Sequence, residues 1–332
     1  MKFGIYAGGR AGTTCSRAPD PGRTGELVEE IAGGAAFVVR EYVHFFGAEP
    51  DPEVVASLGA AGELSGLTMP DDWYVRGGRE LDLVVSYLPA EADLAGWLGF
   101  LDLVIERYAG IARYLQVTLE PNFPIPLIDG SSPGVMEALI EGLPYARRRL
   151  DARGCRDVRV GFSVAEPAEW LGGDEEFWRR LAKVPHDEFA AVVEYVGLGL
   201  YPDAFGPPVP MPDLRAMTEH ALRHLRENCL AAVGIPAATP IHVAETGSPS
   251  LPGRDQVGSL ETMLSVVRGL AAELNITAYE LFGLRDADTA AGTALGAFGL
   301  VTDEYERKPS FDFYRRTVRE GGAPGGPGRR EG

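Results

Sequence analysis

The chain has 332 residues, 45% of them hydrophobic, and its formal net charge at pH 7 is −17. A chain of this length can bury one large core or two ordinary ones, whereas so negative a protein repels nucleic-acid backbones and anionic membranes. The sequence has no run of 18 apolar residues and no secretion signal. We therefore expect a cytoplasmic protein with neither nucleic-acid nor membrane partners.

Short apolar segments alternate regularly with helical patterns along the chain. Strand-like segments occupy residues 2–8, 36–46, 81–90, 113–121, 158–166, 196–205, 240–249 and 277–286. Helical patterns follow them at 24–36, 52–60, 93–110, 133–154, 175–185, 187–195, 212–232, 260–275 and 309–320. Thr24 is the expected N-cap of the first helix.

The strand-like segments are continuous apolar runs rather than strict alternations, which is typical of a parallel sheet covered by helices. Eight strand–helix repeats predict an α/β fold, a single (β/α)8 TIM barrel, in preference to an open doubly wound sheet. The barrel is expected to span residues 1–320 as one catalytic domain. The Gly- and Pro-rich segment 321–332 is expected to be a disordered tail.

Ionisable side chains gather where the predicted strands end, and in such a barrel the chemistry lies at the carboxyl ends of the strands. These residues are Glu120, Glu166, Tyr201, Asp203, Glu245, Arg285 and Asp286, with Arg40 and His44 on the second strand. Burying such groups is costly, so their clustering indicates a functional site.

Glu120 and Glu245 follow strands that are three units apart, so they are expected to lie roughly across the barrel mouth from each other. Glycoside hydrolysis requires such a pair, because one carboxyl group protonates the leaving oxygen while the other attacks the anomeric carbon or activates water. Strict alternation places Thr118 and Gln116 inside the barrel with Glu120. With Glu245 inside, it turns His242 outward, toward the helices.

Several segments resemble the clan A glycoside hydrolases: "LQVTLEPN" on strand four, "YPDAF" on strand six, "IHVAETGSP" on strand seven and the closing "YELFGLRDAD…FGLVTDEYERKPSFDFYR". The resemblance covers essentially the whole chain. It implies a (β/α)8 retaining enzyme, with Glu120 as the acid/base and Glu245 as the nucleophile. Tyr201 would then hydrogen-bond the nucleophile, and Arg40 would lie beneath it and keep it ionised.

Five further residues are predicted to contact the substrate. The resemblance suggests Asn122, Glu166 and Arg285. The positions of His44 on strand two and Trp73 in the following loop make them candidates for lining the pocket and stacking on a sugar ring. No cofactor is expected, and the substrate is predicted to be a small glycoside or oligosaccharide.

Leu119 departs from the family pattern, which has an asparagine immediately before the acid/base to bind the sugar 2-hydroxyl. Hydrogen bonds to that hydroxyl strengthen in the transition state. The leucine therefore suggests a substrate without an ordinary 2-hydroxyl, another contact at that position, or lost hydrolase activity. Strand eight also offers Phe282 and Leu284 where the family often has a tryptophan.

Two other functions stay open on the sequence alone. Leu119 favours a catalytically silent barrel that binds carbohydrate. A metal-dependent sugar isomerase or epimerase could use Glu120, Glu166 and Glu245, although it would need further histidine or aspartate ligands. No metal site is predicted: the three cysteines form no CxxC pair, and His220 and His224 lack the glutamate of the HExxH motif.

Overall fold

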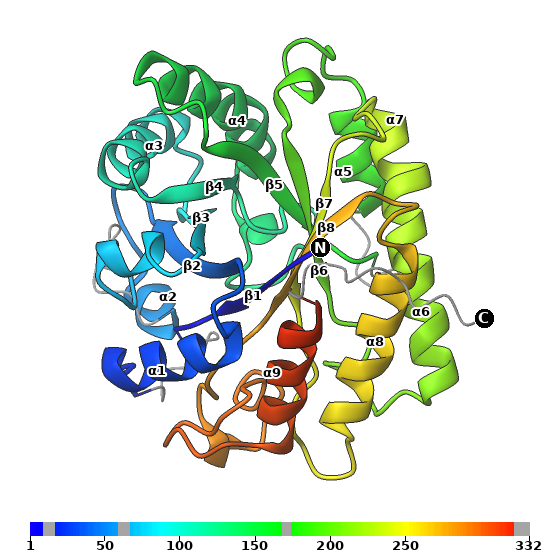
Figure 1. Ribbon diagram of the computed structural model, residues 1–332. Coiled ribbons are helices and arrows are strands. Elements are labelled where there is room, and N and C mark those ends of the chain that lie inside the picture. Colours follow the sequence, from blue (N-terminus) through cyan, green and yellow to red (C-terminus); the bar gives the residue numbers. More distant parts are fainter. Residues whose placement is uncertain (9–16, 59–66, 168–173, 322–332) are drawn as a thin grey trace, which may run out of the picture.

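The computed structural model describes residues 1–8, 17–58, 67–167 and 174–321 and confirms the predicted barrel (Figure 1). Parallel strands pair in chain order and the last pairs with the first, so the sheet closes on itself. These strands are β1 (Lys2–Tyr6), β2 (Phe37–Phe45), β3 (Arg79–Tyr87), β4 (Ala112–Val117), β5 (Arg159–Ala165), β6 (Tyr195–Leu200), β7 (Ile241–Thr246) and β8 (Ile276–Leu281). Their carboxyl ends therefore all open at one end of the barrel.

Helices surround the barrel (Figure 1). They are α1 (Pro21–Ala32), α2 (Pro52–Ser57), α3 (Leu94–Tyr108), α4 (Val135–Ala152), α5 (Asp174–Leu181), α6 (Met211–Arg223), α7 (Ala231–Val233), α8 (Gln256–Leu270) and α9 (Pro309–Gly321). A π-helix, His224–Leu230, joins α6 to α7. Outward-facing strand residues and inward-facing helix residues form one continuous apolar core. Helices α1 and α9 pack side by side, which completes the ring.

Two helical predictions differ from the structure. Helix α1 begins three residues before Thr24, because the Asp20 carboxylate accepts a hydrogen bond from the Arg23 backbone and Pro21 has a helical φ. Thr24 lies inside the helix, buried against Tyr305. The predicted helix at 187–195 is wrong, since a single 3-10 turn at Ala190–Val192 leads directly into β6.

His242 points into the barrel, so the prediction that it faces outward is wrong. Its ring stacks on Tyr195 at a centroid distance of 4.6 Å. The cause is an irregularity in β7: Leu198 pairs with Val243, but the next residue, Gly199, pairs with Glu245. One extra residue in β7 breaks the alternation, as a β-bulge does, and both His242 and Glu245 then face the interior.

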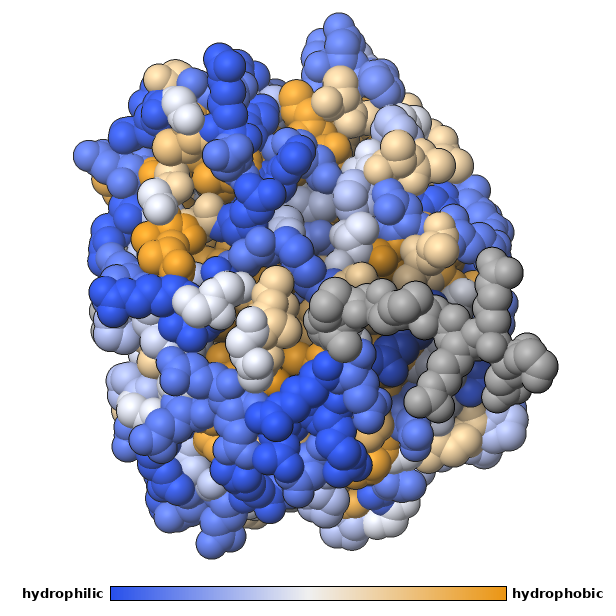
Figure 2. All heavy atoms as spheres, viewed as in Figure 1, coloured by the Kyte–Doolittle hydropathy of each residue, from blue (hydrophilic) through white to orange (hydrophobic). Residues whose placement is uncertain are grey.

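The face shown in Figure 2 is mainly hydrophilic, and its apolar side chains form small, separate groups. This is the usual appearance of a solvated surface. Within the described residues, no helix has the length and apolar character needed to cross a membrane. The predicted tail lies outside the described residues except for Gly321, the last residue of α9.

Candidate active site

A cavity of about 810 Å³ lies at the carboxyl end of the barrel. Its polar lining consists of Tyr6, Tyr42, His44, Glu120, Glu166, Tyr201 and Glu245. Most of the remaining wall is apolar and comes from the strand-end loops, for example Leu119 after β4, Phe205 after β6 and Phe298 after β8. A mainly apolar concavity with a few convergent polar groups is typical of a small-molecule site.

Arg40 on β2 organises the floor of the cavity. Its side chain is only 1% exposed and donates hydrogen bonds to Asp82 Oδ2 at 2.7 Å, to Gln116 Oε1 at 2.9 Å and to Glu245 Oε1 at 3.1 Å. The guanidinium thus lies between two carboxylates, and these hydrogen bonds together fix its orientation. A planar guanidinium suits this role because its donors have a rigid geometry.

Glu245 receives hydrogen bonds on both carboxylate oxygens. Tyr42 donates to Oε1 at 2.6 Å, beside the Arg40 contact, and Tyr201 donates to Oε2 at 3.2 Å. The predicted neighbours Tyr201 and Arg40 are therefore both in contact with Glu245. Three donors from β2 and the end of β6 stabilise negative charge on this group and restrict its rotation.

Glu120 reaches the same cavity through an unusual backbone. Strand β4 ends at Val117, and Thr118 and Glu120 have φ angles of 67° and 47°. This left-handed conformation is disfavoured for residues with a side chain. The Glu120 carboxyl group then occupies the space above Gly199, where even a Cβ atom would lie 1.9 Å from Oε1. Glycine at position 199 is therefore required for Glu120 to lie as it does.

Asp129 holds the loop that carries Glu120, a role that the sequence analysis missed. Its buried carboxyl group accepts hydrogen bonds from the backbone nitrogens of Leu119 and Tyr87, both at 2.7 Å, and from the Ser86 hydroxyl. The loop after β4 is thereby tied to the end of β3. Burial raises the pKa of Asp129 to about 7. In the sequence, the aspartate inside the apolar run "PIPLIDG" could have indicated this buried role.

Burial and charge change the protonation of two other carboxyl groups in the cavity. Burial, followed by the nearby charge of Glu245, raises the pKa of Glu120 well above its usual range. Burial raises the pKa of Glu166 to about 8. Glu166 is therefore mainly protonated at neutral pH. The shift at Glu120 favours its protonated form, which can donate a proton to a bound molecule.

The inward face of β2 supplies two further cavity residues. Alternation from Arg40 places Tyr42 and His44 on the same face of the strand, and their rings stack with centroids 6.4 Å apart. Burial lowers the pKa of His44 to about 4, so its ring is neutral at pH 7. His44 Nδ1 has no hydrogen-bond partner among the described residues, which leaves it available to a ligand. Tyr42 was missed, although the same alternation that places His44 indicates it.

Three predicted substrate contacts do not line the cavity. Asn122 bonds the backbone of Ala165 and the Asp174 carboxylate, so it joins the loop after β4 to the end of β5. Arg285 donates to the backbone carbonyls of Arg17 and Ala18.

Trp73 packs on the Arg79 guanidinium, at a centroid distance of 4.2 Å. Arg79 begins β3, so Trp73 lies toward the opposite end of the barrel from the cavity. On strand eight, Phe282 lines the cavity and stacks on Tyr6, whereas Leu284 belongs to the apolar core.

Several solved structures of similar fold are glycosidases. The family 1 β-glucosidase of Exiguobacterium antarcticum matches with a TM-score of 0.63 at 14% identity, over 96% of this chain and 97% of that one. The family 1 β-glucosidase of Thermotoga maritima matches with a TM-score of 0.58 at 14% identity, over 98% of both chains. The β-glycosidase of Thermosphaera aggregans gives 0.59 at 14% identity, over 90% of this chain and 84% of that one.

Neither a protein-family model nor a curated protein sequence matches this chain. The likeness to the clan A enzymes therefore rests on shape rather than on overall sequence similarity, and at 14% identity it concerns the fold. The chain shares the (β/α)8 architecture of these β-glucosidases at 14% sequence identity.

Proposed function

We propose that this protein is a retaining glycoside hydrolase in which Glu245 is the nucleophile and Glu120 is the acid/base. The observation that carries the proposal is the different surroundings of two carboxyl groups in one cavity. Glu245 is surrounded by donors that stabilise its charge, whereas burial and the charge of Glu245 raise the pKa of Glu120 and so favour its protonated form. Acid-assisted nucleophilic displacement requires one carboxyl group with a stabilised charge beside another whose protonated form is favoured.

In the first step, a Glu245 oxygen attacks the anomeric carbon while Glu120 transfers its proton to the leaving oxygen. Tyr42, Tyr201 and Arg40 keep the attacking carboxylate in place. In the second step, Glu120, now ionised, takes a proton from water, and the resulting attack releases the sugar from Glu245. Once the Glu245 charge is neutralised in the glycosyl ester, its contribution to the raised Glu120 pKa is removed, which favours this second role.

The wall of the cavity supports a substrate with an apolar aglycone. Leu119 and Ile125 lie beside the acid/base, and Phe205, Met217 and Leu295 surround the outer part of the cavity. The last three are 60%, 43% and 40% exposed, although large apolar side chains are usually buried. A wall of this kind gains free energy from burying alkyl or aryl groups but gives few hydrogen bonds to a second sugar.

Labelling with an activated 2-deoxy-2-fluoro-glycoside tests the mechanism, because the fluorine slows hydrolysis of the glycosyl ester more than its formation. We expect one glycosyl unit per chain, on a peptide that contains Glu245, and no label on the Glu245→Gln variant. Mass spectrometry of the intact and digested protein gives both results. Turnover of glycosides without any label at Glu245 would exclude the retaining assignment. Saccharide binding with neither label nor turnover would identify a silent carbohydrate-binding barrel instead.

A series of glycosides with methyl to octyl aglycones tests the nature of the substrate. Each buried methylene contributes about 0.8 kcal/mol, so kcat/KM is expected to rise up to about fourfold per added carbon until the cavity is filled. Phe205→Ser should reduce this slope without changing kcat/KM for the methyl glycoside. A kcat/KM that does not depend on chain length would refute the apolar-aglycone assignment while leaving the mechanism intact.

A further inference from the structure

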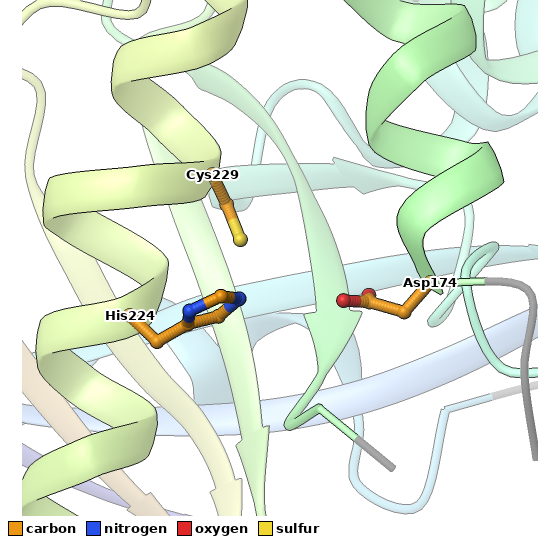
Figure 3. A group of neighbouring side chains, drawn as sticks. All are labelled: Asp174, His224 and Cys229. Carbon is orange, nitrogen blue, oxygen red and sulfur yellow. The ribbon is translucent and has the colours of Figure 1, made fainter. Parts of the chain in front are cut away.

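Three side chains of different chemical type converge outside the barrel, away from the catalytic cavity. Asp174 begins α5, while His224 and Cys229 belong to the π-helix. One donor atom from each lies within 4.8 Å of the other two. In Figure 3 the carboxylate approaches from one helix, and the imidazole and thiol approach from the other, so that all three face the same space.

The π-helix is the reason that His224 and Cys229 face the same space. These residues are five positions apart, and in an α-helix that spacing separates two side chains by roughly 140° around the axis. A π-helix has i→i+5 hydrogen bonds and is more widely wound, which brings residues five apart close to alignment. Helix α6 changes to this form at His224 and returns to α-helical form at Ala231. Such segments are rare and occur frequently at functional sites.

Cys229 is buried, with only 5% of its surface exposed, yet it has no hydrogen-bond partner within the described residues. Its sulfur points toward the space between His224 and Asp174 (Figure 3). Asp174 is fixed on its other side, because its Oδ1 accepts hydrogen bonds from Asn122 at 2.8 Å and from Trp178 at 3.0 Å. Oδ2 accepts no hydrogen bond from the described residues and therefore remains for a ligand.

We propose that Asp174, His224 and Cys229 bind one Zn²⁺ ion. Sulfur, imidazole nitrogen and carboxylate oxygen are the ligand types of protein zinc sites, whereas Mg²⁺ and Ca²⁺ prefer oxygen alone. Three protein ligands leave one tetrahedral position for water, which can enter because Asp174 and His224 are partly exposed. The ion would attach the start of α5 to the π-helix.

The bound ion would also affect the loop that carries Glu120. Asn122 bonds the Asp174 carboxylate, and its amide group also pairs with the Ala165 backbone at the end of β5. Asn122 lies two residues after Glu120. Zinc would therefore fix the far end of a short chain of contacts that leads to the catalytic cavity.

Titration of the full-length, chelator-treated protein with Co²⁺ tests the site directly. A cobalt–thiolate bond gives an intense charge-transfer band in the near ultraviolet, so we expect this band to saturate at one equivalent. Zn²⁺ should displace the cobalt, and mass spectrometry should find one zinc per chain. Because the ion binds the folded state, added Zn²⁺ should also raise Tm.

Matched variants identify the ligands. Cys229→Ser should abolish the charge-transfer band, and Asp174→Asn or His224→Gln should weaken zinc binding by roughly 100-fold or more. Asp174→Asn keeps an acceptor for Asn122 and Trp178, so its Tm in chelator should stay near that of the wild type. His220→Ala and Cys155→Ser should bind zinc like the wild type.

No cobalt band in the folded wild type, or a band that survives in Cys229→Ser, would refute the site. The proposed ligand set would be refuted if Asp174→Asn, with its Tm in chelator unchanged, bound zinc as tightly as the wild type.

Discussion

Replacing Glu245 with glutamine is expected to lower kcat for a glycoside by at least about a thousandfold, because the amide cannot form the glycosyl ester. Glutamine keeps the size of the side chain; its amide oxygen can still accept hydrogen bonds from Arg40 and Tyr42, and its amide nitrogen can donate to the Tyr201 hydroxyl. The fold should therefore persist, and the loss should appear in kcat rather than in KM. Steady-state kinetics together with the thermal unfolding of each variant provides the measurement.

Glu120→Gln should give a loss that depends on the leaving group. Aglycones of high pKa need the proton from Glu120, so their kcat/KM should fall roughly 10²–10⁴-fold. For dinitrophenyl glycosides kcat/KM should fall much less, because dinitrophenolate leaves without protonation. The basic limb of the pH–rate profile should also disappear, because in the wild type activity falls as Glu120 ionises with rising pH.

Glu41→Gln is the matched control for both glutamates. Glu41 is as buried as Glu120 and accepts hydrogen bonds from Tyr74 and Thr68, but it does not line the cavity. The activity of the Glu41→Gln variant should stay within about twofold of that of the wild type. If Glu120→Gln and Glu245→Gln retain as much activity as this control, neither glutamate has the proposed role.

The largest loss of stability is expected from Arg40→Met. Arg40 is enclosed with Asp82, Glu245 and Glu280, and removing the cation leaves buried carboxyl groups without a compensating charge. Breaking a buried ion pair in this way costs roughly 3–5 kcal/mol of unfolding free energy. Urea unfolding at pH 8 should show this difference from the wild type.

The loss should be smaller at pH 5. Burial raises the pKa of Asp82 and of Glu280 above their usual ranges, and Arg40 opposes both shifts. Without Arg40 the two pKa values rise further. The folded variant therefore keeps protons on Asp82 and Glu280 at pH values where the unfolded chain has already lost them. Its stability then falls more steeply than that of the wild type as pH increases above the unfolded values.

Arg226→Met separates this charge effect from simple loss of a buried arginine. Arg226 is also buried, but it donates to the backbone carbonyls of Leu274, Pro236 and Thr239 rather than to carboxylates. Its substitution should cost stability about equally at both pH values. Equal costs at pH 5 and pH 8 for Arg40→Met would contradict the proposed role of the buried carboxyl groups.

The sequence predicted the barrel and the centre of the candidate site because both depend on repeated local patterns. Each strand–helix unit carries its own apolar run, and chain order fixes which strand ends are neighbours. Glu120, Glu166, Tyr201 and Glu245 could therefore be placed at one cavity without any side-chain geometry.

The incorrect or missing predictions arose where the strand departs from regular alternation or where long-range contacts decide the position of a side chain. Alternation placed His242 outside because the extra residue in β7 cannot be recognised in "IHVAET". Trp73 follows strand two in sequence, but its loop returns to the start of β3, where Arg79 packs on the indole. Asp129 could not be linked to Leu119, because that contact depends on how the loop after β4 folds back.

The conformation and burial of Glu120 lower the stability of the barrel. A left-handed φ of 47° costs a glutamate on the order of 1–3 kcal/mol, and burying its carboxyl group adds to that cost. Glycine would adopt the same conformation without strain. Glu120 is therefore a residue that the stability of the barrel alone would not favour at this position.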